Sequence, residues 1–280
     1  MILGRTRIQT KTADQIRTMR RAGLVVAEGL ERMGRAAVPG ATTADLDRIG
    51  RQVLESHGAT SNFLHYGADW GIQPYPGVAC ISVNEVVVHG IPGPRELREG
   101  DIVSIDYGAV VDGWHGDAAR TFCVGEVSRE AAALSERTRE SMWAGIAAVA
   151  DGARVGDISA AVQECLESAA ESYGIVRDYT GHGIGTAMHM DPEVPNWGRS
   201  GRGPRLTAGM CVCIEPMATL GEEKTAVLDD DWTVVTTDGS WAAHWENTVA
   251  ITEGGLWVLT EPDGGRAELE ARGVPFAPLD

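Results

Sequence analysis

Residues 102–122 read IVSIDYGAVVDGWHGDAARTF, and this stretch predicts a β-hairpin. Apolar strand-like runs at Ile102–Ile105 and Ala109–Val111 precede Asp112-Gly113, a dipeptide typical of tight hairpin turns. Asp106 and Asp117 then fall on neighbouring strands. A carboxylate that interrupts an apolar strand is unusual as a solvated surface group, so both aspartates are candidate metal ligands.

Three further charged residues interrupt or adjoin apolar runs in the same way. They are His182 in a glycine-rich stretch, Glu215 after a run from Cys211, and Glu246 before a run from Asn247. Taken singly, each is more often a salt-bridge or turn residue than a ligand. Four carboxylates gathered with one imidazole would need cations, because like charges ~4 Å apart repel by about 4 kcal/mol at an effective dielectric of ~20. The pattern therefore suggests a two-metal hydrolase.

These motifs occur in the order and spacing of the type I methionine aminopeptidases, which the chain resembles from about Thr12 to Thr260. The resemblance rests on residues 82–92 (SVNEVVVHGIP), the hairpin aspartates, Gly181–Gly185, Ile214–Met217 and Trp245–Thr248. It implies the pita-bread fold, a pseudo-symmetric antiparallel sheet covered by helices. The mixture of helical patterns and hairpins independently favours an α+β protein. No internal repeat is visible in the sequence.

The resemblance also implies a role for each ligand. Asp106 would bind one divalent ion and His182 and Glu215 the other, while Asp117 and Glu246 would bridge both. Glu215 would in addition take a proton from the attacking water and pass it to the departing amine. Two ions of Co, Mn, Fe or Zn suit these ligands, whereas copper and an iron–sulfur cluster do not.

His89 and His189 resemble the two histidines that assist catalysis in the family without binding metal. His189 would bond the scissile carbonyl region, and His89 would contact the amide nitrogen that is released; a structural role is the alternative for both. His57, His65 and His115 fit structural roles better. His115 stands two residues before Asp117, where it would either support that ligand or face solvent.

The resemblance implies a substrate-binding pocket for a methionine side chain. Its lining positions match Tyr75, Cys80, Met188 and Trp232, all compatible with a thioether. The stretch 64–74 departs from the family, with Asp69 in place of a small residue or Cys and Ile72 in place of an aromatic residue. An unpaired carboxylate beside an apolar side chain is costly, so Asp69 must point away, be paired or contact a polar substrate.

Three positions near the proposed metal centre also depart from the family pattern. Gly108 replaces a usual Thr, Asn247 a usual His, and His244 a usual Gln. The hairpin in fact looks more like the prolidase and proline-aminopeptidase branch of the same fold. One alternative function is therefore a related metallopeptidase with altered N-terminal specificity. A second is a non-catalytic binding module, which the presence of all five ligand residues disfavours.

Length and composition are compatible with one catalytic domain over residues 12–260. It would be flanked by an N-terminal arm at 1–11 and a C-terminal tail at 261–280, expected to be irregular apart from a docked Phe276. No apolar run is long enough for a bilayer and no signal peptide is evident, which predicts a cytoplasmic protein. The five cysteines predict reduced thiols, with core packing favoured over a zinc pair for Cys211 and Cys213.

The formal net charge of −16 argues against direct DNA binding. Charge is uneven, since residues 1–35 hold eight basic and three acidic side chains. The family acts on the N-termini of nascent polypeptides, so this basic segment could contact the ribosome, although a solvated helix face is the favoured reading. We expect a monomer.

A capping box at Thr12–Gln15 predicts the first helix, which should end near Ala37. Further helices are expected over the ranges Thr43–His57, Ser128–Ala150 and Asp157–Tyr173. Strands are expected over Ala79–His89, Asp101–Val124, Met210–Glu215, Thr233–Thr237 and Trp245–Thr252.

Overall fold

The hairpin is present, with its first strand at the centre of one sheet and its second strand at the edge. In the computed structural model, which describes residues 8–279, β4 (Ile102–Val111) pairs with β5 (Trp114–Cys123) along its full length. On its other side β4 pairs with β2 (Ala79–Val83) and β1 (Thr60–Ser61), and all these pairings are antiparallel. The fold class is α+β, as predicted.

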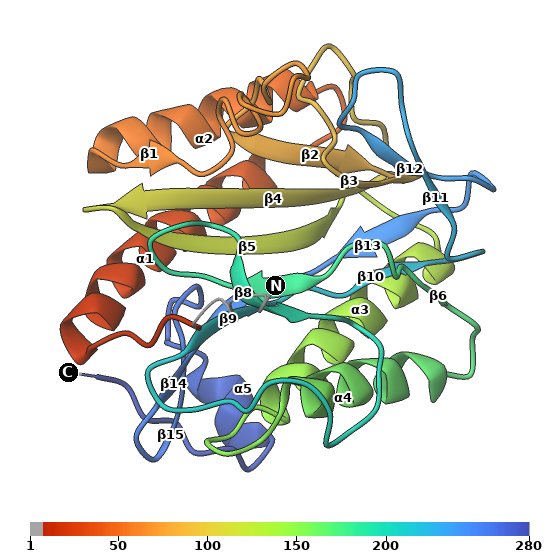
Figure 1. Cartoon of the computed structure of the whole chain (residues 1–280). Helices are drawn as coiled ribbons and strands as arrows, with labels where there is room; N and C mark the ends of the chain where they lie inside the picture. Colours follow the sequence, from red (N-terminus) through yellow and green to blue (C-terminus); the bar gives the residue numbers. More distant parts are fainter. Residues whose placement is uncertain (1–7, 280) are drawn as a thin grey trace.

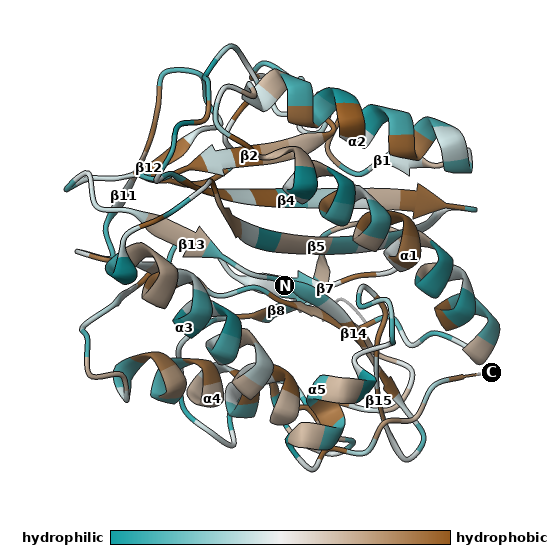
Figure 2. Ribbon diagram, turned by 180° about the vertical axis from the view of Figure 1, so that it is seen from behind, coloured by the Kyte–Doolittle hydropathy of each residue, from teal (hydrophilic) through white to brown (hydrophobic). Residues whose placement is uncertain are grey.

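Two helices pack against this sheet, α1 (Ala13–Ala36) and α2 (Thr43–His57) (Figures 1 and 2). Each begins with a capping box, Thr12 with Gln15 and Thr42 with Asp45, so the first backbone donors of both helices are satisfied. Buried residues of both helices, such as Leu30 and Leu46, belong to one apolar cluster with Ile81 and Ile105 of the strands. Both helices agree with the predicted ranges to within about a residue.

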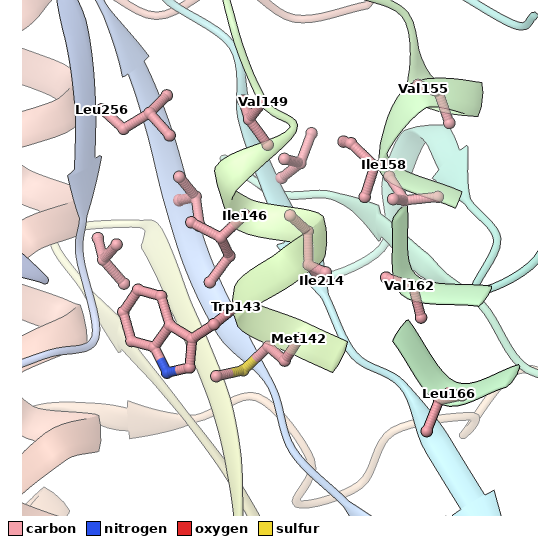
Figure 3. Close-up of a cluster of buried hydrophobic side chains, with 14 of the residues drawn as sticks. Met142, Trp143, Ile146, Val149, Val155, Ile158, Val162, Leu166, Ile214 and Leu256 are labelled. Carbon is pink, nitrogen blue, oxygen red and sulfur yellow. The ribbon is translucent and has the colours of Figure 1, made fainter. Parts of the chain in front are cut away.

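A second sheet lies in the other half of the molecule, with the strand order β15-β14-β9-β7-β8. Its strands are Gly255–Val258, Asn247–Thr252, Cys211–Ile214, Gly181–Gly183 and Met190–Val194, in that order. The helices α3 (Arg129–Ala147) and α4 (Val155–Glu167) pack together beside it (Figure 1). Figure 3 shows the core between them, where Trp143 and Ile146 of α3 lie near Ile214 of β9.

Two three-stranded sheets complete the fold. One has the order β13-β10-β6, with the bounds Ala242–His244, Met217–Thr219 and Gly174–Ile175. The other has the order β11-β12-β3, with the bounds Thr225–Val227, Val234–Thr236 and Val86–Val88. Three of these strands, β3, β10 and β13, each contribute one residue to the wall of the cavity described below.

The two large sheets meet where β5 passes β14. The backbone N–H of Glu246 donates to the carbonyl of Ala119 at 2.9 Å. The Asp117 N–H donates to the Thr248 hydroxyl at 3.2 Å, and that hydroxyl donates back to the Asp117 carbonyl at 2.8 Å. Residues more than a hundred positions apart are therefore held side by side, and two of them are the predicted bridging ligands.

Several predicted elements differ from the structure in extent. The strand expected over Ala79–His89 is two strands, because Asn84 adopts a left-handed conformation at φ 54°. Its side-chain oxygen accepts from the N–H of Ile102 at 3.0 Å and its amide donates to Asp101 at 2.9 Å. The third helix ends three residues earlier than expected, at Ala147, and the fourth ends at Glu167.

The C-terminal tail contains more regular structure than predicted. A short helix, α5 (Arg266–Ala271), replaces the irregular chain expected there, and Leu269 anchors it in the core. The Asp263 carboxylate accepts from the N–H groups of Gly265 and Ala267, which caps the helix start. Phe276 docks as expected, beside Leu256.

The N-terminal arm is described from Ile8 onward, so Arg5 and Arg7 lie outside the described residues. Lys11 donates its backbone N–H to Gly209 at 2.8 Å, which ties the arm to the second sheet. All five cysteines are free thiols, and Cys211 and Cys213 pack in an apolar cluster with Ile16. Between residues 8 and 279, no helix has the length and apolarity needed to cross a membrane.

Candidate metallohydrolase site

A cavity of about 170 Å³ lies at the seam between the two large sheets. All five predicted metal ligands, both predicted helper histidines and the four predicted pocket residues line it. Other lining residues were not predicted: Phe63, Tyr66, Trp70, Val88, Tyr179, Thr180, Met217 and His244. The cavity is therefore one continuous space with a charged part and an apolar part.

Asp106 and Asp117 project from the central hairpin into the charged part. In the β4–β5 register Asp106 is opposite Ala119 and Asp117 is opposite Gly108, so the two side chains lie on the same face of the sheet. Their ligand atoms and one of Glu246 all lie within 4.8 Å of one another. The register of the hairpin thus sets the spacing of the two carboxylates.

Glu215 and Glu246 come from the second sheet. Asn247 pairs with Ile214 in the β9–β14 register, so the two glutamates stand side by side where those strands end. Glu246 is 2% exposed and Glu215 is 9% exposed. An oxygen of Glu215 lies 3.3 Å from Nε2 of His182.

His182 is held in one tautomer. Its Nδ1 lies 3.0 Å from the carbonyl oxygen of Gly183, which can only accept, so Nδ1 carries the proton and Nε2 has a free lone pair. Burial, followed by the charge of His189, lowers the pKa of His182 to about 3. A neutral imidazole with its lone pair aimed at a carboxylate cluster is a metal-ligand arrangement.

Burial also raises the pKa values of the four carboxyl groups. The pKa of Asp117 is raised to about 7, although hydrogen bonds from Asn62 and from the Ala118 backbone oppose the shift. The pKa values of Asp106, Glu215 and Glu246 are raised well above the usual range, first by burial and then by the charges of their carboxylate neighbours. Such a cluster holds its negative charge poorly by itself.

Within the described part of the chain, three of the predicted ligand residues have the unpartnered oxygen atoms that a cation site requires. Buried oxygens of Asp106, Asp117 and Glu246 have no hydrogen-bond partner within residues 8–279. Buried polar atoms in native proteins are nearly always partnered, so orphaned carboxylate oxygens that converge on one space indicate bound cations. Four carboxylates and an imidazole match the ligands of first-row divalent metals.

The two helper histidines lie at different depths. His89 is in a left-handed conformation at φ 58° and packs edge-on against Tyr179. Burial lowers the pKa of His89 to about 4. His189 is more exposed, packs edge-on against His182 with ring centres 4.4 Å apart, and has its Nδ1 2.6 Å from the Tyr66 hydroxyl.

The four predicted pocket residues form one apolar cluster with Phe63. Tyr75, Cys80, Met188 and Trp232 are all less than a tenth exposed. The Tyr75 hydroxyl donates toward the carbonyls of Ala79 and Gly90, at 3.1 and 2.9 Å, and the Trp232 ring N–H donates to the Gln73 carbonyl at 2.6 Å, so both of these polar groups have partners. An apolar slot with a thiol and a thioether in its walls suits an unbranched apolar side chain.

Asp69 does not reach this slot. It is exposed and is not part of the cavity wall, which rules out the possibility that it stands unpaired beside the apolar residues. The neighbouring Trp70 does line the cavity, stacked on Trp232 with ring centres 6.0 Å apart and edge-on to Tyr66 at 5.1 Å. The family has an aromatic residue at the position of Ile72. In this chain Tyr66 and Trp70 supply aromatic surface to the cavity instead.

Two other positions that depart from the family pattern, Gly108 and Asn247, lie against neighbouring polar side chains. A Cβ added to Gly108 would stand 2.2 Å from the Asn62 amide nitrogen, so Asn62 occupies the space of the missing threonine. Asn62 also contacts Nδ1 of His115 through its side-chain oxygen at 3.0 Å, so the His115 ring lies against the residue that fills the space beside Gly108. Asn247 accepts from Arg120 and Thr260, each at 2.7 Å, in a network behind Glu246.

Phe63 and Tyr66 carried no sequence signal that marked them as site residues. They lie between a two-residue strand and a loop, and only the folding of that loop over Tyr75 brings them to the cavity. His57 and His65, which were predicted to be structural, do not line the cavity. The His57 ring contacts Glu28 on α1 at 2.7 Å.

Comparisons with known proteins agree with this geometry. The family model for metallopeptidase family M24 matches residues 17–253. The methionine aminopeptidase of Clostridium acetobutylicum is 50% identical over 89% of this chain and 97% of its own length. Methionine aminopeptidase 1 of Mycobacterium tuberculosis is 51% identical over 92% and 96%.

A solved structure of methionine aminopeptidase from Thermotoga maritima superimposes with a TM-score of 0.87 at 41% identity, covering 91% of this chain and all of that one. A prolidase from Pyrococcus furiosus has a TM-score of 0.68 at 20% identity, over 90% of this chain and 65% of that one. The prolidase likeness therefore extends to the fold alone.

Proposed function

The chain belongs to metallopeptidase family M24, among its methionine aminopeptidases, and from this we propose that it removes N-terminal methionine from proteins and peptides with a small second residue. The single observation that carries the proposal is the joining of two environments in one cavity. Orphaned carboxylate oxygens lie in the same space as a satisfied apolar slot.

Two divalent ions would be held by the residues of the charged part. Asp106 would hold one ion, His182 and Glu215 the other, and Asp117 and Glu246 both. Glu246 is suited to bridging because its ligand atom belongs to every group of three that converges within 4.8 Å. Such ions supply Lewis acidity, which makes water a nucleophile near neutral pH.

Glu215 would accept the proton of the attacking water and deliver it to the departing amine. Its carboxylate stands at the end of β9, beside His182 and deep in the cavity, so it is within reach of a water in the charged part. A carboxylate in this position can take the proton as a base and then return it as the acid in the second half of the reaction.

His189 would stabilise the scissile carbonyl as its oxygen becomes negative. The Tyr66 hydroxyl beside Nδ1 leaves Nε2 free to donate when the tyrosine donates to Nδ1. Neutral His89, at the deeper position, would accept from or donate to the amide nitrogen that is released. His189 and His89 would therefore both contact the amide bond that is cleaved.

The methionine side chain would occupy the slot formed by Tyr75, Cys80, Met188 and Trp232 with Phe63. Asp69 lies outside the cavity, so it gives no support to a polar first residue. A panel of peptides that differ in the first and second residues, each assayed with Co, Mn, Fe and Zn, tests the assignment. A preference for Met-Ala and Met-Gly is expected, and a preference for another first residue would refute it.

The partners would be the N-termini of nascent polypeptides, in the cytoplasm, with the enzyme acting as a monomer. Ribosome contact through the basic helix α1 has limited support, because its arginines are engaged within the protein. Arg17 pairs with Asp14, Arg21 with Asp112, and Arg20 donates to three backbone carbonyls near Leu259. Cosedimentation with ribosomes at two salt concentrations tests the contact, and light scattering tests the monomer.

A further inference from the structure

His244 places an additional ligand-type atom among the carboxylates. It ends the short strand β13, and its side chain is 2% exposed. Its Nε2 is buried, lacks a hydrogen-bond partner within residues 8–279, and lies 3.5 Å from an oxygen of Glu215. Ligand atoms of His244, Glu215 and Glu246 all lie within 4.8 Å of one another.

The backbone of His244 is fixed from the side of the hairpin. Its N–H donates to the hydroxyls of Thr121 and Ser104, at 3.0 and 3.2 Å. The Thr121 hydroxyl donates back to the His244 carbonyl at 2.9 Å. On the other side His244 pairs with Met217 in the β10–β13 register. The backbone that carries the ring is therefore held by β4 and β5 on one side and by β10 on the other.

An orphaned nitrogen in this position needs a physical account. A buried polar atom without a partner costs free energy, so native proteins rarely keep one unless something binds it. A simple hydrogen bond to Glu215 is a poor account, because 3.5 Å is long for an N–H···O bond. The two carboxylates that converge with His244, Glu215 and Glu246, are both proposed metal ligands.

We propose that Nε2 of His244 is a further metal ligand, to the ion that Glu215 and Glu246 hold. The inference rests on the two-ion site proposed above. It gives the centre two imidazole donors, His182 and His244, in place of the single one that the sequence motifs indicated. Imidazole favours Co and Zn over Mn, so this residue would also shift the metal preference of the site.

Proton NMR of the cobalt(II)-loaded protein tests the ligation directly. A histidine bound to cobalt(II) through one nitrogen has a strongly hyperfine-shifted, exchangeable proton on the other. The wild-type protein should show two such signals. His244→Gln and His182→Gln should each show one, and His57→Gln, the same substitution on the exposed face of α2, should show two.

Calorimetric titration with Co²⁺ and with Mn²⁺ provides a second readout. His244→Gln should weaken Co²⁺ binding at one of the two sites by about 10- to 100-fold and Mn²⁺ binding by less. His57→Gln should match the wild type. Circular dichroism of each metal-free variant identifies any that fails to fold, and His244→Asn then serves as the second substitution.

The possible failures are distinguishable. If the wild-type protein binds two cobalt ions but shows one shifted ring proton, and His244→Gln binds both ions unchanged, His244 is no ligand while the proposed function stands. If the wild-type protein binds fewer than two ions, the two-ion site falls and this inference falls with it. Two shifted signals that persist in His244→Gln would also overturn the assignment.

Discussion

The charged and the apolar parts of the cavity are built on opposite principles, although Cys80 of the slot and Asp106 of the charged part are paired residues on neighbouring strands. In the apolar slot the Tyr75 hydroxyl and the Trp232 ring N–H have hydrogen-bond partners, and the walls pack against one another. In the charged part three carboxylates and one imidazole have buried atoms without a hydrogen-bond partner among residues 8–279. The protein alone satisfies the groups of the slot, whereas the carboxylates of the charged part need cations to balance them. The two parts should therefore respond differently to substitution.

The difference follows from burial. An apolar side chain gains stability when it leaves water, while a carboxylate loses it unless a cation or several donors compensate. The buried carboxylates therefore destabilise the metal-free protein, and metal binding offsets this destabilisation. Substitutions in the charged part should affect the chemical step. Substitutions in the slot should affect substrate affinity and packing.

Glu215→Gln should have the largest effect, because it removes a charged ligand and the proposed proton carrier together. We expect kcat on Met-Ala peptides to fall by about 10²–10⁴, the usual span of general acid–base catalysis. Steady-state kinetics with metal content measured on the same samples tests this. A change in KM alone would show that Glu215 belongs functionally with the slot, which would break the comparison.

His189→Ala should have the next largest effect. Its proposed bond strengthens as the carbonyl oxygen becomes negative, so kcat should fall by about 10²–10³ with little change in KM. Tyr66→Phe keeps the ring packing but removes the hydroxyl beside Nδ1, and should lower kcat less than His189→Ala. Equal losses of affinity and rate in His189→Ala would instead indicate a packing role.

Asp117→Asn should show how far the buried carboxylates lower the free energy of unfolding of the metal-free protein. The pKa of Asp117 rises from 3.8 to about 7 on folding. A raised carboxyl pKa stabilises the folded state below the unfolded pKa, and this contribution is lost as pH rises toward 7. The metal-free variant should therefore gain about 2–4 kcal/mol of unfolding free energy relative to metal-free wild type between pH 4 and pH 8.

Urea unfolding in the presence of a chelator at several pH values measures this difference. The buried histidines titrate alike in both proteins, so their opposite contributions largely cancel in the comparison. Added Co²⁺ should stabilise wild type more than the variant, because the variant has lost a charged ligand. A difference that does not change with pH would mean that the pKa of Asp117 is not raised in the metal-free protein.

Much of this fold was predictable because its signals are local. The Asp112-Gly113 turn and the capping boxes of α1 and α2 act within a few residues, and the structure agrees with them closely. The two- and three-residue strands, such as β6 and β7, are too short to show a period and form through distant partners. Helix α5 was missed because its stability comes from the burial of Leu269 and not from its Pro- and Gly-rich surroundings.

The site divides in the same way. The ligand residues stand out because a charge inside an apolar strand is conspicuous, and the cavity brings all five together. Phe63, Tyr66 and Trp70 do not stand out, because aromatic residues in a loop have no periodic context. Their position depends on backbone bonds between Tyr66 and Tyr75 that close the loop. The same loop carries Asp69 outward, which linear spacing from Tyr75 could not show.

The smallest expected effect concerns the slot, and it is the closest test of the comparison. If the slot recognises methionine by apolar contact alone, norleucine peptides should be cleaved nearly as well, because exchanging sulfur for CH₂ alters binding by only about 1 kcal/mol. We expect kcat/KM for norleucine-Ala within about fivefold of Met-Ala. Leu, Lys and Pro at the first position should be poor, since branching, charge or a ring does not fit a narrow apolar slot. Asp69→Ala, which changes an exposed residue outside the cavity, serves as the matched control and should leave this order unchanged. A reversal of the order in Asp69→Ala would mean that the loop moves Asp69 into the slot when substrate binds, and the slot would then share the electrostatic character of the charged part.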